Sequence, residues 1–553
     1  MIKDNRVWIA NDKINGEALT ILPGMANRHG LVAGATGTGK TITVKVLAEA
    51  FSDMGVPVFL ADVKGDLAGM IRPGTDSEDM QKRISRFGIG DTFSYKAYPA
   101  SFWDIFGQNG IQLRTTISEF GPLLLGRVLG LNDLQSDILT IVFKIADDHD
   151  WLLADTKDLK AVLNYAQRYS ADLALEYGRI NSSSIGAIMR SLIALELAGG
   201  DVFFGEPSLQ ITDWITTDSY GRGMITILDS ESLINNGRLY STFLLWFMSE
   251  LFETLPEVGD LEKPKMVFFF DEAHLLFDDA PKELLDKIEQ VVKLIRSKGV
   301  GIYFCTQNPR DIPDGILAQL GNKIQHALRA YTPAEQKKIK AAADSFRVNP
   351  EFDTLEVISS LGIGEAVVSF LQEDGTPGIA RQAAILPPQS RMGSISDEER
   401  DQAIKSSLLY SRYANAVDPE SAYEILVKVN EEEIARREQA MREAEEEKAR
   451  LREEKERQKE EAARERQEER ERKQAEAKAA REEAARKKKE EMEKAREERK
   501  KKTEAKKVGK AVTGTVGREV GKGLGARFGS LGKKIGGNLG AQLGRGILDT
   551  LFK

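Results

Sequence analysis

The stretch from residue 34 to residue 41 has the residue types and spacing of a phosphate-binding loop. Its sequence, GATGTGKT, places four residues between a first glycine and a closing Gly-Lys-Thr. Glycines let backbone N–H groups wrap phosphate oxygens, and the helix expected to follow would present its positive end to them. Lys40 would reach the β- and γ-phosphates of ATP, and the Thr41 hydroxyl would bind Mg²⁺. The predicted nucleotide-binding residues of the loop are Gly34, Ala35, Thr36, Gly37, Thr38, Gly39, Lys40 and Thr41.

A pair of carboxylates follows a run of five apolar residues further along the chain. The run is Met266–Phe270, and the carboxylates are Asp271 and Glu272. A short apolar run of this kind indicates a buried strand, which would deliver both side chains to its carboxyl end. We expect Asp271 to hold Mg²⁺ through its water shell and Glu272 to polarise the water that attacks the γ-phosphate.

Polar residues also follow two other apolar runs. Gln307 comes after the run at 300–305, where its amide would lie level with Glu272 and contact the γ-phosphate or its water. Asp62 ends the run at 56–62, and Lys64 follows it. Ligands bind at the carboxyl ends of the strands in parallel α/β sheets, so Asp62 and Lys64 are candidates for nucleotide contacts.

These residues require a sheet that carries all the strand ends to one edge. A strand before the loop, a helix after it and a strand at 56–62 form a parallel βαβ unit, and the fold class is therefore α/β. Residues 112–200 have helical apolar spacing and indicate an inserted helical subdomain. The other expected elements are a hairpin of 5–10 and 17–22, helices at 234–255 and 281–297, and strands at 223–228, 323–328, 365–370 and 378–384.

The composition favours a large folded protein in a reducing compartment. The chain has 553 residues, of which 41% are hydrophobic, and a single cysteine, Cys305, which lies in an apolar run. One cysteine excludes an internal disulfide. We find neither a basic-then-apolar start nor an apolar run long enough to cross a bilayer, so we expect a cytoplasmic protein.

Charge changes sharply after residue 430. Residues 431–507 hold 28 Lys/Arg and 26 Asp/Glu, and residues 508–553 hold eight and two. Subtracting +2 and +6 from the net charge of −8 leaves −16 for residues 1–430. An acidic body does not indicate nucleic-acid binding, so any DNA contact would come from local basic loops or a pore lining.

The charged segment 431–507 predicts an isolated helix supported by charge pairs four residues apart. A coiled coil is the weaker interpretation because no apolar seam runs through it, and a disordered linker is the other alternative. The tail, 508–553, spaces its glycines among apolar and basic residues. Its partner would be another tail, a membrane surface or nucleic acid.

Taken together, these motifs resemble those of the HerA/FtsK group of P-loop translocases, and most closely the bacterial HerA-like ATPases. The resemblance covers about residues 20–390. Four segments carry the resemblance, and the last of them discriminates this group from other P-loop proteins. They are Asn27-Arg28-His29-Gly30 before the P-loop, Asp62-Val63-Lys64-Gly65, Asp271-Glu272, and Arg296-Ser297-Lys298-Gly299-Val300-Gly301 leading to Gln307-Asn308-Pro309.

The resemblance implies a RecA-like core that forms hexameric rings with ATP at the subunit boundaries. It suggests Arg296 as an arginine finger and Arg28 as a second arginine that faces the nucleotide. Only a hairpin precedes the core, where HerA carries a β-barrel domain that helps to bind its nuclease. A nuclease partner is therefore not implied.

We accordingly expect a Mg²⁺-dependent ATPase that translocates on DNA. The alternative is an assembly or scaffold ATPase that acts on a protein or membrane partner through its C-terminal tail. An RNA helicase of the Asp-Glu-Ala-His type is excluded because the chain lacks the Ser-Ala-Thr-type motif and the second RecA-like domain. The expected domains are a hairpin (1–23), an ATPase core (24–390), a connector (391–430), a charged helix (431–507) and a glycine-rich basic tail (508–553).

Overall fold

The computed structural model describes residues 1–277, 280, 282–330 and 332–500. The chain divides into two compact units, Met1–Arg437 and Glu438–Lys553. The predicted glycine-rich tail, 508–553, and the end of the predicted charged helix, 501–507, lie outside the described residues. Among the described helices, none is both long enough and apolar enough to cross a membrane.

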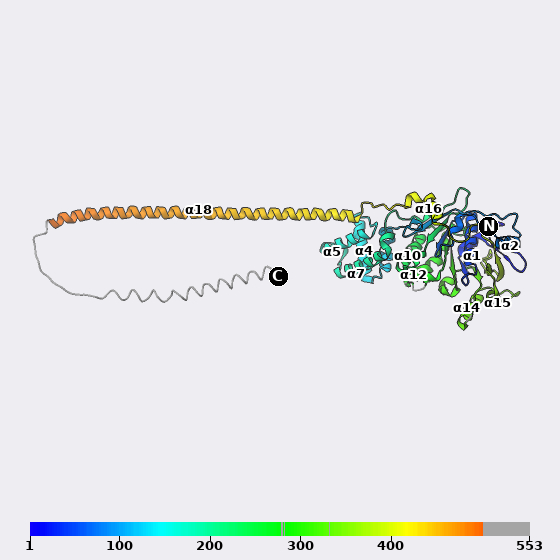
Figure 1. Ribbon diagram of the computed structural model, residues 1–553. Helices are drawn as coiled ribbons and strands as arrows, with labels where there is room; N and C mark the ends of the chain where they lie inside the picture. The colour runs from blue at the N-terminus through cyan, green and yellow to red at the C-terminus, as the bar shows by residue number, and fades with distance from the viewer. Residues whose placement is uncertain (278–279, 281, 331, 501–553) are drawn as a thin grey trace. The chain divides into compact units, whose positions relative to one another are not determined.

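One large sheet organises the first unit (Figure 1). Its strand order is β1-β2-β13-β12-β11-β4-β10-β9-β5-β8-β6-β7, with β3 paired to β2. The strands from β11 to β7 in this order are parallel, which confirms the predicted α/β class. The bounds are β1 Ile2–Lys3, β2 Arg6–Asp12, β3 Ala18–Ile21, β4 Gly30–Ala33, β5 Val58–Asp62, β6 Ala100–Asp104, β7 Ile111–Gln112, β8 Ile225–Asp229, β9 Met266–Phe270, β10 Val300–Thr306, β11 Asn322–His326, β12 Glu365–Ser369 and β13 Arg381–Ile385.

Helices cover both faces of the central strands, which is why these strands are apolar throughout rather than alternating. Successive residues of β9 show the two faces. Phe268 packs against Phe247 of α10 (Gly237–Thr254) on one face, with α12 (Lys282–Leu294) in the same core. Phe269 packs against Phe51 of α1 (Lys40–Asp53) on the other. The sheet is thus a fully buried platform, with polar chemistry confined to its edges.

The predicted helical insertion lies between β7 and β8. It comprises α3 (Ile117–Val128), α4 (Asp133–Asp148), α5 (Thr156–Arg168), α6 (Ser170–Tyr177), α7 (Ser182–Leu195) and α8 (Asp201–Phe203). Side chains at the N-caps of α3, α4, α5 and α7 define the starts of these four helices, and Asn132 and Asp155 both form capping boxes. The apolar faces of α3, α4, α5 and α7 share one core with α10.

Two predicted domain boundaries need correction. The N-terminal hairpin, predicted as a separate element of residues 1–23, belongs to the main sheet, because β2 pairs with β13. Sequence pattern alone does not reveal this pairing, which joins strands more than 350 residues apart. Past β13, the predicted connector of 391–430 contains α16 (Asp397–Ser406), α17 (Tyr410–Tyr413) and the first turns of α18 (Ala422–Lys500).

The charged helix therefore begins at Ala422, before the predicted residue 431. Its start is fixed by buried Asp158 of α5, whose Oδ1 accepts hydrogen bonds from Ser421 Oγ (2.5 Å) and Tyr423 N (2.9 Å). Ala422 and Leu426 are buried in the core of the first unit. These apolar residues lie outside the charged segment, which is why its composition placed the start too late.

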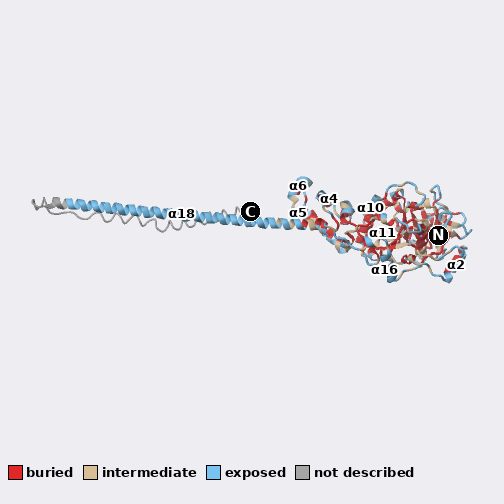
Figure 2. Cartoon of the chain, turned by 90° about the horizontal axis from the view of Figure 1, so that it is seen from above, coloured by how far each residue is buried: buried red, intermediate tan, exposed pale blue. Residues whose placement is uncertain are grey.

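The described part of the second unit, residues 438–500, belongs to α18. Its side chains are exposed as far as they are described (Figure 2). Ion pairs four residues apart support it, including Lys473–Glu469 (2.7 Å) and Lys487–Glu483 (3.1 Å). Residues 431–500 are thus helical, and the disordered-linker alternative is wrong for them.

Buried His29 lies at the start of β4 and links it to β10. Its Nδ1 accepts a hydrogen bond from Ile302 N (3.0 Å), and its backbone has a positive φ of 59°. Burial, together with the nearby charge of Arg296, lowers the pKa of His29 to about 4. Folding therefore requires the neutral imidazole.

This pKa predicts a loss of stability in weak acid. An unfolded histidine titrates near 6.5, so below that pH the unfolded chain binds a proton that the folded chain excludes down to about pH 4. The contribution of His29 to stability is complete above pH 6.5 and falls by about 2 kcal/mol at about pH 5. His29→Asn keeps an acceptor and tolerates positive φ but does not titrate. Urea unfolding at about pH 7.5 and about pH 5 should show a smaller loss in the variant, and equal losses would contradict this assignment.

Candidate active site

The P-loop connects β4 to α1 with a backbone that needs glycine. Gly34, Gly37 and Gly39 have φ of 154°, 76° and 110°. A Cβ on Gly34 would lie 2.5 Å from the Cβ of His326, and one on Gly39 would lie 3.2 Å from the backbone N of Gly364. Close packing against β11 and the turn before β12 therefore shapes the loop, in addition to its own sequence.

Lys40 is buried within the loop. Its Nζ donates hydrogen bonds to the carbonyl oxygens of Gly34 (2.7 Å) and Ala35 (3.3 Å). No carboxylate pairs with this ammonium among the described residues. A buried cation that contacts only neutral carbonyls is suited to an anionic ligand, and the loop therefore fits a polyphosphate.

His326, the last residue of β11, packs against the P-loop and against α1. Its Nδ1 lies 2.8 Å from the carbonyl oxygen of Glu365, so Nδ1 carries the hydrogen, and Nε2 accepts from Thr43 Oγ1 (2.9 Å). Burial lowers the pKa of His326 to about 4, which keeps the ring neutral. Sequence reasoning missed this residue. The only sequence signal for this role is that a histidine is the last residue of a buried strand, and many core histidines share that feature.

Asp271 and Glu272 follow β9, as predicted, and both are buried. Glu272 has a positive φ of 45°, a conformation that is costly for a residue with a Cβ. Ala273 N donates to the Cys305 carbonyl (2.7 Å) and so holds the turn to β10. Burial, followed by the charge of Glu272, raises the pKa of Asp271.

Glu272 is held from both neighbouring strands. Lys64, after β5, donates to Oε1, and Gln307 Nε2, after β10, donates to Oε2 (3.3 Å). Burial alone would raise the pKa of Glu272, but hydrogen bonds from Lys64 and Gln307 outweigh burial and lower it. Glu272 is therefore an ionised carboxylate, the state that a general base requires.

Strand register explains why these three side chains meet. Ala61 of β5 pairs with Phe270 of β9, which pairs with Phe304 of β10. Lys64, Glu272 and Gln307 come three, two and three residues after this row. The row therefore brings together residues that are more than 200 positions apart in the sequence.

Asp62 has a supporting place in this site. Its Oδ1 accepts from Lys64 N (3.2 Å) and Gly65 N (2.9 Å), and its Oδ2 accepts from Leu67 N (3.0 Å). Burial raises the pKa of Asp62 to about 6. Its carboxylate folds the loop that carries Lys64, and a direct contact between Asp62 and nucleotide stays a prediction.

The structure does not bring Arg28 and Arg296 to the P-loop of their own chain. Arg28 precedes β4, and Arg296 lies in the 3-10 turn Ile295–Lys298 that precedes β10. Both therefore lie at the amino ends of strands whose carboxyl ends carry the P-loop and Gln307. The seven residues of β10 separate its amino end from its carboxyl end by about 20 Å. Among the described residues, neither arginine has an ion-pair partner.

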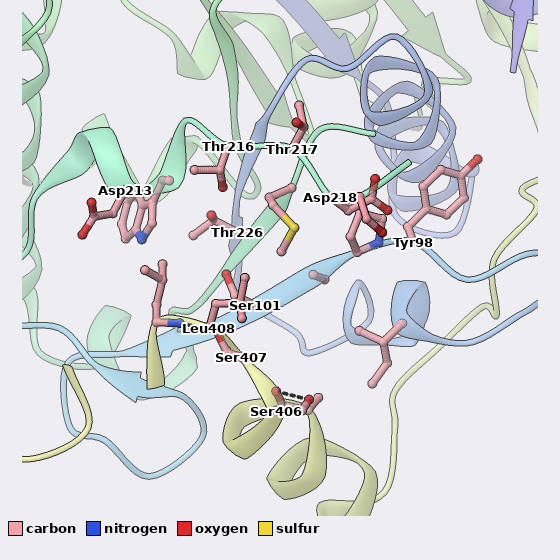
Figure 3. Close-up of a pocket in the computed structure, with 18 of the residues that line it drawn as sticks. Tyr98, Ser101, Asp213, Thr216, Thr217, Asp218, Thr226, Ser406, Ser407 and Leu408 are labelled. Carbon is pink, nitrogen blue, oxygen red and sulfur yellow. Dashed lines mark hydrogen bonds between the residues drawn. The ribbon is translucent and has the colours of Figure 1, made fainter. Parts of the chain in front are cut away.

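A large cavity of about 730 Å³ lies apart from this site, at the amino ends of β6 and β8 (Figure 3). Its labelled lining includes Ser101, Asp213, Thr216 and Ser406. None of the predicted site residues lines it. The nucleotide site is instead defined by the loop and strand ends described above.

A family model described as helicase HerA-like C-terminal matches residues 8–535. A probable helicase of Methanocaldococcus jannaschii is 31% identical over 146 residues, which cover 26% of each chain. The DNA double-strand break repair helicase HerA of Sulfurisphaera tokodaii is 21% identical over 360 residues, which cover 62% of each chain. The chain thus spans less than two thirds of the length of these curated relatives.

Among solved structures, the bacterial conjugative coupling protein TrwBdeltaN70 in its unbound monoclinic form is similar, with a TM-score of 0.46 and 13% sequence identity. The match covers 71% of this chain and 91% of that one.

The site geometry predicts distinct effects for two substitutions. Lys40→Ala should abolish hydrolysis and weaken nucleotide binding, because the ammonium is the only buried cation of the loop. Glu272→Gln should retain ATP binding but slow turnover by about 100-fold or more, because an amide cannot accept the proton of water. Equilibrium binding and single-turnover assays separate the two effects. Glu196→Gln, in the helical insertion, is the control, and unchanged turnover in Glu272→Gln would remove that residue from this role.

Proposed function

Because the chain belongs to the family of helicase HerA-like C-terminal proteins, we propose that it is a Mg²⁺-dependent ATPase that translocates on DNA. The observation that carries this proposal is the ionised Glu272, held beside a loop whose buried Lys40 has only neutral partners. The relatives named as DNA repair helicases support DNA as the substrate.

The residues of the site divide the work of hydrolysis. The P-loop amides and Lys40 bind and orient the β- and γ-phosphates. Thr41 and Asp271 offer the hard oxygen ligands that Mg²⁺ prefers, and the bound ion would neutralise charge on the phosphates. Glu272 takes the proton of the attacking water, while Gln307 orients the carboxylate that does so.

We further propose a homo-oligomeric ring, six-membered as the family resemblance implies. Arg28 and Arg296 support it, since a finger at the opposite edge of the sheet can reach a nucleotide only on another copy. ATP as the fuel and Cys305 as a buried free thiol favour the cytoplasm as the location. The partner of the C-terminal tail is left open by this proposal.

Turnover with and without DNA tests the function. The full chain, separated by size into oligomers, should hydrolyse ATP faster when duplex or single-stranded DNA is present, by about tenfold or more. The stimulation should weaken as salt rises, because phosphate contacts release counterions. A folded, ATP-hydrolysing chain that responds to neither form of DNA would contradict translocation and favour the scaffold alternative.

Mixing two inactive variants tests the ring. Arg296→Ala should bind ATP yet lose turnover by about 1000-fold, within the range for arginine fingers. Mixed with Glu272→Gln it should regain part of the activity, because about one boundary in four then pairs an intact finger with an intact carboxylate. Arg179→Ala, an exposed arginine of the insertion, should behave as wild type. Full activity in a monomer would refute the shared site.

A further inference from the structure

The two donors to Glu272 differ in charge, since Lys64 is a cation and Gln307 is a neutral amide. The Glu272 side chain is 5% exposed, whereas that of Lys64 is 45% exposed. Lys64 and Gln307 are both exposed, and they occupy Oε1 and Oε2 of a carboxylate that is itself buried. With one hydrogen bond on each oxygen, the carboxylate is a weaker acceptor for a proton from water.

The loop that carries Lys64 is itself firmly held. Three backbone N–H groups of residues 64–67 donate to buried Asp62, and Gly65 provides the positive φ of 72° that the turn needs. The backbone of Lys64 is thus fixed, and its flexible side chain is free to change partners. An ion pair with one exposed member is readily exchanged, unlike a pair that is buried on both sides.

A terminal phosphate would compete for this lysine. Gly34, whose carbonyl oxygen accepts from Lys40, donates its N–H to the carbonyl oxygen of Thr306 (3.2 Å). The next residue, Gln307, donates to Glu272, so the phosphates that Lys40 binds would lie near the pair. A γ-phosphate carries more negative charge than one carboxylate and offers more acceptor oxygens. ADP lacks this group and would leave the pair intact.

We propose that Lys64 is a positioning residue that holds Glu272 at rest and moves to the terminal phosphate when a nucleoside triphosphate binds. This inference rests on the proposed ATPase function. Transfer of the ammonium frees Oε1, which then takes a proton from water as the water oxygen bonds to the γ-phosphorus. The bond from phosphorus to the bridging oxygen breaks, and that oxygen leaves with ADP. Hydrolysis is thereby tied to the presence of the γ-phosphate.

The test compares Lys64→Met, Lys64→Arg and wild type in the full-length chain. Lys64→Met should bind a non-hydrolysable ATP analogue about tenfold less tightly while its ADP affinity is unchanged, and Lys64→Arg should restore most of the preference. Lys160→Met, which breaks the Lys160–Glu196 ion pair (2.7 Å) in the insertion, is the matched control.

A double-mutant cycle that combines Lys64→Met with Glu272→Gln adds a second measurement. Because the resting pair is already broken in Glu272→Gln, the loss of analogue affinity on adding Lys64→Met should exceed the loss in the wild-type background. Equal losses, or an unchanged preference for analogue over ADP in Lys64→Met, would overturn the inference while wild-type hydrolysis still supports the function. If Lys64→Met unfolds, Lys64→Gln gives the same comparison. A wild-type chain without hydrolysis would instead refute the proposed function.

Discussion

The pairing of β10, β9 and β5 is the constraint on which the rest of the structure depends. Parallel pairing aligns Ala61, Phe270 and Phe304 in one row. Glu272 comes two residues beyond this row, and its donors Lys64 and Gln307 each come three residues beyond it. A slip of one residue in either pair would turn apolar side chains away from their cores and separate the donors from the carboxylate. Core packing and catalytic geometry are therefore specified by the same hydrogen-bond ladder.

The conformation of the P-loop also requires close contact with the segments next to it. A Cβ on Gly34 would collide with His326, and one on Gly39 would crowd the backbone of Gly364, so the loop is held by β11 and the turn before β12 as well as by its own glycines. The strained backbone of Glu272 lies on the other side of β4. Strain of this kind persists only where surrounding contacts impose it, and here Lys64, Gln307 and the Ala273–Cys305 hydrogen bond provide them.

Local signals explain what the sequence could predict. The P-loop, the Asp271–Glu272 pair and the strand that carries each are contiguous patterns, so their types and positions were accessible without a structure. The attachment of β2 to β13 and the position of His326 depend on contacts between distant segments. Those contacts leave no local periodicity, because a buried polar residue looks the same in the sequence whether it caps a loop or binds a ligand. The early start of α18 was missed for a related reason, since Ala422 and Leu426 matter only where α5 is present to cover them.

The two edges of the sheet perform different tasks. The carboxyl edge carries the P-loop, Glu272 and the side chains that hold Glu272, and the amino edge presents Arg28 and Arg296 without a carboxylate partner among the described residues. The amino and carboxyl ends of these strands cannot come together within one subunit, because the strands between them are rigid and packed on both faces. Any charge that these arginines supply to a transition state must therefore act on another copy. In the proposed ring, Lys64 would respond to the γ-phosphate on its own P-loop, whereas Arg28 and Arg296 would respond to that of a neighbour.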